Sequence, residues 1–327
     1  MTDFLSLLKT TPAYKIAVSD KSANRLNHAY LILHPDGENL GEYLKIFASI
    51  IACKEVEPCL ECRTCRLIAE QKSVDTLIYP KEKDTVVTDD INSLTEECYL
   101  KPIESDKKIF IINHGETMTA QAQNKLLKTL EEPPKNVYIL IGATNEYGFL
   151  PTVLSRVNKL EIPQFSEDTL FSALKNDYTE HEKLKTAISC GDGTVGKAIS
   201  LYGDEKTFLL MEFVSEMLTK MQSSKNVLEF SKRLTDLKVE FLDFLDVLER
   251  AFADMLLGFS GREDLVKNKA LYEKVKGAEG YKTGSIIYAL EKITEAQKRK
   301  KFNANANMLT EWLLMQILEG RYKWQKL

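Results

Sequence analysis

The chain has 327 residues, enough for about two or three domains of ordinary size, and its 44% hydrophobic and 28% charged residues are typical of a globular protein. A net charge of −4 and a pI of about 5.8 argue against a protein that holds nucleic acid by itself, because such proteins carry a basic balance that neutralises phosphates. No apolar run approaches the roughly 18 residues of a membrane span, and the first residues lack a signal peptide, so we expect a cytoplasmic protein without a membrane partner.

Short apolar runs in the first 165 residues predict buried strands at 29–33, 76–79, 108–112 and 137–141. Each run is continuous rather than alternating, as expected for a parallel sheet that is covered on both faces. A weaker strand is predicted at 159–162, before Pro163, and helical patterns at 40–53 and 119–132 lie between the runs. This alternation predicts a three-layer α/β domain.

After Pro163 the pattern becomes helical. Residues 166–190 are predicted to be helical, and Gly191-Asp192-Gly193 separates them from a further helix that begins at about Val195. From Lys206 onward apolar residues recur at helical spacing, with loops expected at the glycines of 258–261 and 277–284. We therefore expect an α/β domain of residues 1–165, a small helical domain of residues 166–205 and a larger helical domain of residues 206–327.

Four of the six cysteines lie within thirteen residues, at Cys53, Cys59, Cys62 and Cys65. Without a secretion signal, such clustering indicates a metal site rather than disulfides. Four thiolates suit tetrahedral zinc, and part of the spacing also resembles a ferredoxin iron–sulfur run. Arg66 follows where such iron–sulfur runs often carry proline, so we favour a closed, structural Zn²⁺ site. Cys98 and Cys190 stand alone, and we expect them to be buried thiols.

In many ATPases with a parallel sheet, the phosphate-binding loop GxxxxGK[ST] follows the first strand. In this chain the segment after the first strand is His34-Pro35-Asp36-Gly37-Glu38-Asn39-Leu40-Gly41. Leu40 replaces the lysine and Gly41 replaces the magnesium-binding hydroxyl residue, while Asp36 and Glu38 add negative charge where phosphates would bind. We expect no ATP in this site.

A second part of the ATPase machinery is also missing. After the strand at 108–112, Asn113 replaces the magnesium-binding acid and His114 stands at the position of the general base. The two losses together predict a degenerate ATPase. A later segment, Gly191–Ala198, matches GxxxxGK literally, but it follows a helix and lacks the final hydroxyl residue, so we interpret it as a turn between helices.

Several segments resemble the gamma/tau/delta-prime family of bacterial DNA polymerase III clamp-loader subunits, which belong to the AAA+ class. Ser155-Arg156-Val157 is similar to the Ser-Arg-Cys motif of that family. The other similar segments are 28–31, 53–65, 124–134 and 302–307. The resemblance implies an AAA+ α/β domain with a zinc module at 53–65, a helical lid domain at 166–205 and a helical collar domain for oligomerisation at 206–327.

The resemblance also implies a role. Gamma/tau subunits keep an intact phosphate loop, so the delta-prime branch of the family is the nearer match. This branch implies a stator in a ring that opens the sliding clamp and places it on primer–template DNA, with gamma/tau and delta subunits as partners. Arg156 would act as an arginine finger in trans, facing the ATP of a neighbouring gamma/tau subunit.

Other interpretations stay open at this point. The chain could be an active, gamma/tau-like ATPase that tolerates Leu40 and Asn113, or a zinc-bearing DNA-binding protein that acts alone. Arg156 could be an ordinary surface arginine. Thr144-Asn145 follow a strand where an ATPase of this family senses phosphate, and we expect them to act as caps. His28 could belong to a former base pocket or to the edge of a strand.

Overall fold

The computed structural model of the chain describes residues 3–81, 85–301 and 304–323, so Phe302 and Asn303 of the segment 302–307 lie outside the described residues. Contacts divide the chain into two compact units. The first consists of Met1–Thr179 with Gly193–Gly196, and the second of Glu180–Asp192 with Lys197–Leu327. The predicted domain boundaries at 165/166 and 205/206 stay predictions.

The first unit contains a parallel sheet with the strand order β2-β3-β4-β1-β5. The strands are β1 (Ala29–Leu33), β2 (Thr76–Tyr79), β3 (Lys108–Ile112), β4 (Val137–Ala143) and β5 (Asn158–Glu161). All five predicted strands are thus confirmed, with small shifts at the ends of β4 and β5.

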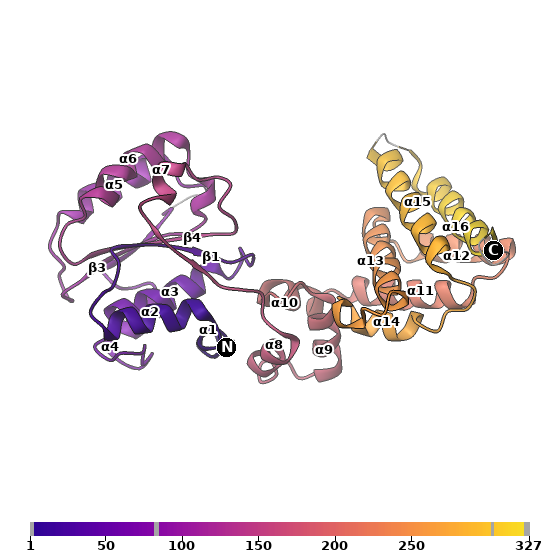
Figure 1. Ribbon diagram of the computed structural model, residues 1–327, viewed down its shortest axis with the longest axis horizontal. Helices are drawn as coiled ribbons and strands as arrows, with labels where there is room; N and C mark the ends of the chain where they lie inside the picture. The colour runs from indigo at the N-terminus through magenta and orange to yellow at the C-terminus, as the bar shows by residue number, and fades with distance from the viewer. Residues whose placement is uncertain (1–2, 82–84, 302–303, 324–327) are drawn as a thin grey trace. The chain divides into compact units, whose positions relative to one another are not determined.

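Helices cover both faces of this sheet (Figure 1), which explains why its central strands are apolar throughout. Alternate side chains such as Leu31, Phe110 and Ile139 pack on one face, in a buried cluster with Leu94 and Leu126 of the covering helices. The first face is covered by α5 (Thr88–Cys98), α6 (Ala120–Glu131) and α7 (Pro151–Leu154), and the other by α1 (Phe4–Lys9), α2 (Pro12–Ser22), α3 (Leu40–Ala52) and α4 (Arg63–Ala69).

The segment 166–190 is not one helix, as the sequence pattern suggested, but two. α8 (Glu167–Leu174) belongs to the first unit and α9 (His181–Cys190) to the second. Between them the N–H of Asp177 donates to the carbonyl of Leu174 at 3.0 Å, in a turn. Asn176 and Asp177 favour such turns because their side chains compete for backbone hydrogen bonds, and this local preference interrupts the helical pattern.

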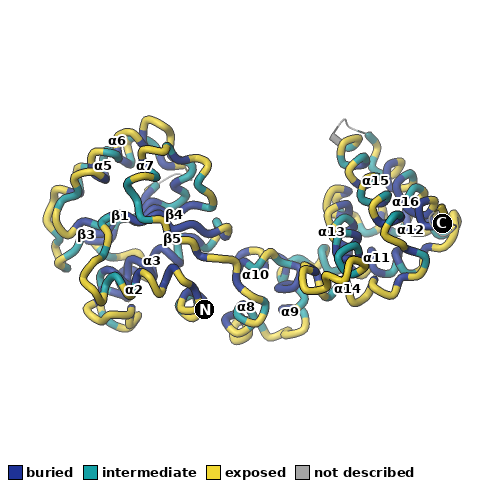
Figure 2. The backbone as a smooth tube through the Cα atoms, in the orientation of Figure 1, coloured by how far each residue is buried: buried dark blue, intermediate teal, exposed yellow. Residues whose placement is uncertain are grey.

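The second unit is helical, and its buried residues form one core that is rich in phenylalanine (Figure 2). Phe213, Phe230 and Phe244 meet edge to face, with ring centroids 5.8 and 6.1 Å apart. Besides α9, its helices are α11 (Glu205–Lys220), α12 (Ser224–Asp236), α13 (Phe241–Phe259), α14 (Lys269–Val275), α15 (Thr283–Lys301) and α16 (Ala306–Lys323), with a 3₁₀ turn at Glu263–Leu265. α10 (Val195–Gly203) begins in the first unit and ends in the second.

One loop prediction is wrong in part, because Gly258 lies inside the last turn of α13. A Cβ atom there would lie 2.1 Å from the hydroxyl oxygen of Tyr272, so the glycine permits close approach of α14 to α13. Gly284 likewise belongs to α15. Within the part of the chain that the structure describes, no helix is both long and apolar enough to cross a bilayer.

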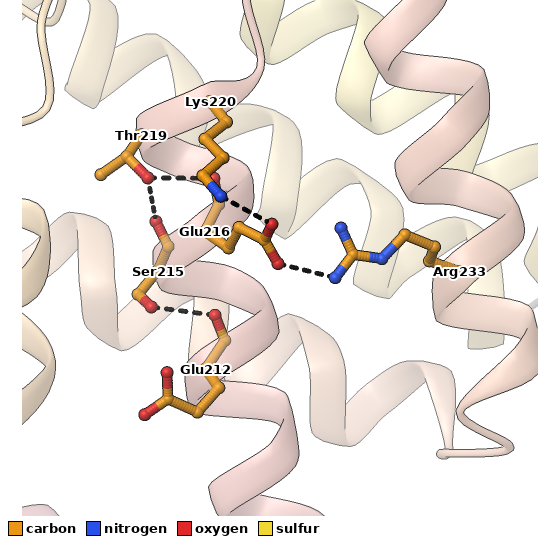
Figure 3. Close-up of polar contacts among 6 residues, drawn as sticks. All are labelled: Glu212, Ser215, Glu216, Thr219, Lys220 and Arg233. Carbon is orange, nitrogen blue, oxygen red and sulfur yellow. Dashed lines mark hydrogen bonds and ion pairs between the residues drawn. The ribbon is translucent and has the colours of Figure 1, made fainter.

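A charged cluster joins α11 to α12 (Figure 3). The carboxylate of Glu216 accepts hydrogen bonds from Arg233 at 2.6 Å and from Lys220 at 3.0 Å. These side chains line a cavity of about 650 Å³ together with Glu212 and Lys274. Arg233 also stacks over the ring of Phe230, with 5.2 Å to the ring centroid.

Candidate functional site

Three of the segments singled out in the sequence meet at the carboxyl edge of the sheet. β1, β3 and β4 are neighbours and run parallel, and His34, Asn113 and Thr144 each follow directly after one of these strands. Parallel strands end at the same edge, which is where ligands bind in open α/β sheets. The structure therefore brings the loop after β1 together with the segments that follow β3 and β4.

Gly37 is the point at which these segments come closest. A Cβ atom at Gly37 would lie 3.2 Å from Cγ2 of Thr144 and 3.5 Å from Cε1 of His114. The loop thus packs directly against the residues that follow β3 and β4. A side chain at Gly37 would press against Thr144, so glycine favours this close approach.

Asp36 is the most buried acid of this loop, with 3% of its surface exposed. Its carboxylate accepts hydrogen bonds from the side-chain amide of Asn39 at 3.0 Å and from the backbone N–H of Asn39 at 3.3 Å. The backbone N–H of Gly196 donates to the same carboxylate at 2.9 Å. A buried, hydrogen-bonded carboxylate therefore lies in the loop at this edge of the sheet.

Leu40 and Asn113 lie at the same edge of the sheet, and both are uncharged. Leu40 is fully buried, and its Cγ would lie 3.1 Å from a Cβ atom placed on Gly142, so its side chain fills the space between α3 and β4. Gly41 lies opposite Asn113, with a distance of 3.5 Å from the Gly41 Cβ position to the amide nitrogen Nδ2. Gly41 and Asn113 are thus adjacent, and neither carries a negative charge.

Glu116 is a residue of this site that the sequence motifs did not single out. Its Oε1 accepts a hydrogen bond from the hydroxyl of Thr144 at 2.8 Å, and Nδ1 of His114 lies 3.8 Å away. His114 has the left-handed conformation, with φ 53° and ψ 47°. Oε2 of Glu116 is buried and has no hydrogen-bond partner among the described residues. Thr144 therefore acts as more than a cap, because it binds the one acid that follows β3.

Arg156 follows α7 and has about a third of its side chain exposed, at 34%. Its Nη1 donates to the carbonyl of Thr152 at 2.8 Å and to the hydroxyl of Ser155 at 3.1 Å. Its Nη2 lies 2.6 Å from Oε1 of Glu131, at the end of α6. The guanidinium is thus held in a defined orientation at the surface of the first unit by partners from two helices.

The four clustered cysteines form a candidate metal centre. Their sulfur atoms all lie within 4.8 Å of one another, and Cys53 Sγ is 3.7 Å from Cys59 Sγ. A tetrahedral site with Zn–S bonds of about 2.3 Å places its sulfurs roughly 3.8 Å apart, so the arrangement fits zinc. Cys53 ends α3, Cys62 caps α4, and Leu60 takes the left-handed conformation in the turn between them.

The surroundings of the sulfurs favour thiolates bound to a cation. Backbone N–H groups of Cys62 and Glu61 lower the pKa of Cys59 to about 7, whereas burial raises the pKa of Cys65. A buried thiolate at Cys65 needs a compensating positive charge, which a metal ion supplies. The structure thus brings together all four residues that the sequence assigned to the metal site.

Lysines hold the metal centre against the rest of the first unit. Lys21 of α2 donates to the carbonyl of Cys53 at 2.8 Å and also to the carbonyl of Glu55, and burial lowers the pKa of this lysine. Lys107 donates to the carbonyl of Ile51 at 2.7 Å. These contacts satisfy carbonyl groups at the C-terminal end of α3, where a helix has no internal donors left.

The remaining predicted residues have structural positions. Nε2 of His28 lies 2.9 Å from the carbonyl of Leu130, so His28 joins the start of β1 to the end of α6. This contact favours the strand-edge interpretation of His28. Cys98 and Cys190 are buried and lie outside the metal cluster, as expected. Burial raises the pKa of each of these two thiols, to about 12 and about 11.

Comparison with known sequences gives consistent relatives. Residues 10–166 match the family model of the DNA polymerase III delta subunit. The DNA polymerase III subunit delta' of Bacillus subtilis is 26% identical over 94% of this chain and 95% of its own length. The gamma subunit of Buchnera aphidicola is 23% identical over 91% of each protein. The tau subunit of B. subtilis is 26% identical over 78% of this chain but only 48% of its own length.

Solved structures with a similar arrangement include two replication proteins. A Thermotoga maritima protein related to the DNA polymerase III gamma subunit is 20% identical and covers 93% of this chain and 99% of its own, with a TM-score of 0.43. The B. subtilis clamp loader delta protein is 10% identical with the same coverage and a TM-score of 0.42. On the sequence matches, the chain is similar to DNA polymerase III clamp-loader subunits of the delta' and gamma/tau types.

Proposed function

We propose that this chain is a delta-prime-type clamp-loader subunit, a catalytically silent stator that helps to load the sliding clamp onto primed DNA. In this proposal it joins gamma/tau and delta subunits in the DNA polymerase III holoenzyme, and it contacts clamp and primer–template DNA through that complex. Residues 166–205 would serve as the lid domain and residues 206–327 as the collar domain through which subunits assemble.

The observation that carries the proposal is the state of the former phosphate loop. Leu40 is part of the core instead of a phosphate-binding lysine, and the buried carboxylate of Asp36 takes up the backbone and amide donors that a phosphate would need. Asn113 cannot replace the acid that holds magnesium, because an amide carries no negative charge. Losing both groups should cost several kcal/mol of transition-state stabilisation.

Arg156 supports a role in a neighbouring active site. A guanidinium that faces a transferring phosphoryl group stabilises the charge that develops on it, and a second subunit can supply it. To reach such a phosphate, Arg156 must leave Glu131, whose side chain is 50% exposed. An exposed ion pair of this kind contributes only about 0.2–1 kcal/mol, so a nucleotide phosphate would compete for the guanidinium easily.

The cysteine cluster is proposed to hold one structural Zn²⁺, with Cys53, Cys59, Cys62 and Cys65 as ligands. Four protein sulfurs leave no open coordination position, and a closed site of this kind stabilises a fold without taking part in catalysis. The ion would link the end of α3 to the start of α4 and so fix the first turn of the module. The stability of the first unit would depend on this link.

Nucleotide binding by the isolated chain tests the silent role against an active, gamma/tau-like one. We expect no heat of binding in calorimetric titrations with MgATP at micromolar concentrations, with a phosphate-loop-bearing gamma/tau subunit as the positive control. Micromolar affinity for ATP would contradict the proposal. Tight binding of the isolated chain to DNA, with a steep dependence on salt, would instead favour a DNA-binding protein that acts alone.

A further inference from the structure

The chain leaves the first unit after α8 and returns to it for four residues, Gly193–Gly196. Backbone hydrogen bonds at both ends fix this return segment. The N–H of Phe165 donates to the carbonyl of Gly193 at 2.8 Å, and the N–H of Gly196 donates to Oδ2 of Asp36 at 2.9 Å. The second contact spans 160 residues of sequence. The segment is part of the GxxxxGK match that the sequence analysis set aside as a turn.

The Gly196 N–H belongs to the first turn of α10, which begins at Val195. Groups at this position have no acceptor inside their own helix, and they carry the positive end of the helix dipole. Proteins commonly use such N–H groups, together with the backbone of a loop, to bind phosphate. Here the acceptor is the carboxylate of Asp36, which the backbone and side chain of Asn39 also bind.

The fit around this carboxylate is close enough to require glycine. A Cβ atom on Gly196 would lie 2.6 Å from Oδ1 of Asp36 and 3.1 Å from Nδ2 of Asn39. Gly193 has φ +79°, a conformation that other residues rarely adopt, and its Cβ would lie 2.9 Å from Cβ of Gln164. Both glycines of the return segment are thus needed where they stand.

We propose that Asp36 is a built-in anion that takes the place of a nucleotide phosphate and ties residues 193–196 to the former phosphate loop. In an ATP-dependent protein a phosphate would make this connection only while nucleotide is bound. In this chain the anion is a side chain of the loop itself, so the connection is present without nucleotide. The same carboxylate excludes a tetrahedral oxyanion from the donors that it occupies. This exclusion of phosphate extends the proposed silent role and rests on it. The hydrogen bond between Asp36 and Gly196 is independent of that role.

Amide hydrogen exchange of the full-length chain, followed by mass spectrometry on a peptide that covers residues 191–198, tests the tie. We expect Asp36→Ala to speed exchange at Gly196 by about 10- to 100-fold, the factor for loss of a hydrogen bond to a charged acceptor. Asp36→Asn keeps an acceptor oxygen of the same size and should give a smaller increase. Glu42→Ala removes the same charge from the first turn of α3, where the carboxylate pairs with Lys45 at 2.7 Å, and should leave Gly196 exchange unchanged. Circular dichroism and zinc content establish that each variant is folded.

Inorganic phosphate tests whether the carboxylate replaces an oxyanion. At millimolar concentration, phosphate should slow exchange at Gly196 in Asp36→Ala but not in the wild-type chain. Unchanged exchange at Gly196 in both folded Asp36 variants would overturn the tie. Failure of phosphate to protect Asp36→Ala, or protection of the wild-type chain, would overturn the replacement. ATP binding by the wild-type chain would refute the silent role while leaving the tie to be judged by exchange alone.

Discussion

Leu40 stands where an ATPase of this fold has its phosphate-binding lysine, and in this chain the residue is fully buried between α3 and β4. The replacement has a physical consequence beyond the loss of a charge. A lysine at this position would have to leave the core to reach a phosphate, and its departure would leave a cavity next to Gly142. Because Asp36 and Asn113 also differ from the residues of an ATPase, we expect that no single substitution gives this site ATPase activity.

Substitution of a single zinc ligand tests the metal centre. We expect Cys62→Ser to lose or weaken zinc binding and to lower the thermal stability of the first unit, because a structural zinc contributes its binding energy to folding. Zinc content by mass spectrometry and thermal unfolding are the measurements. Cys98→Ser, which changes a buried thiol outside the cluster, should keep one zinc per chain. A Cys62→Ser chain that is metal-free yet as stable as the wild type would contradict a structural role.

At the residue scale, spacing was enough to predict some features and not others. The cysteines are close in sequence, so a turn alone brings them together, and the prediction of their cluster is confirmed. Glu131 lies in the segment 124–134 that resembles the family, but the resemblance assigns no role to Glu131 or to Glu116. Their importance comes from Arg156 and Thr144, which are distant in sequence. The sequence could have indicated Glu116, because it is the first acidic residue after β3.

Among the helices, the link between α11 and α12 through Glu216 offers a test of packing in the second unit. Hydrogen bonds from Arg233 and then Lys220 lower the pKa of Glu216 to about 2. A carboxylate with a lowered pKa contributes stability above its ordinary pKa of 4.5, and this contribution is lost as the pH falls toward 2. Because the pair is partly exposed, we discount it to about 0.5–1 kcal/mol.

Glu216→Gln should therefore lower the free energy of unfolding at neutral pH by that amount, and the difference from the wild type should shrink below pH 4.5. Urea unfolding followed by circular dichroism, repeated at several pH values, is the measurement. Glu182→Gln is the control, because Glu182 forms an ion pair with Lys185 but is 89% exposed. Equal effects of the two substitutions would show that the α11–α12 link adds no stability of its own.

The accuracy of the sequence predictions differs between strands and helices for a physical reason. Strands of a covered parallel sheet are continuously apolar, and this pattern located β1 to β4, whereas β5, with Leu160 as its buried residue, gave a weaker signal. The residue at which a helix ends depends on side chains that compete for backbone hydrogen bonds and on packing against other helices. A hydrophobic pattern contains neither kind of information. The break after Leu174 arises from turn-forming residues, and Gly258 stays helical because Tyr272 packs against it. The contact between Asp36 and Gly196 joins residues too distant in sequence for any local pattern.

For the whole molecule, we propose a silent nucleotide site combined with an arginine that acts on a neighbour. Delta' and gamma proteins are similar to this chain over nearly their full lengths. These matches do not distinguish a silent subunit from an active one. That distinction depends on the residues at the carboxyl edge of the sheet and on Arg156, and it is decided by activity in the assembled complex.

The most direct measurement is clamp- and DNA-stimulated ATP hydrolysis by a complex of this chain with the gamma/tau and delta subunits of its source, with and without Arg156→Ala. An arginine finger contributes about 10³- to 10⁵-fold to the rate at one site. We therefore expect normal assembly and the loss of turnover at one of the ATP sites. Arg63→Ala, which removes an exposed arginine paired with Glu104, should have no effect. Normal assembly with unchanged hydrolysis would contradict the role of Arg156, and failure of the wild-type chain to join the complex would contradict its assignment to the clamp loader.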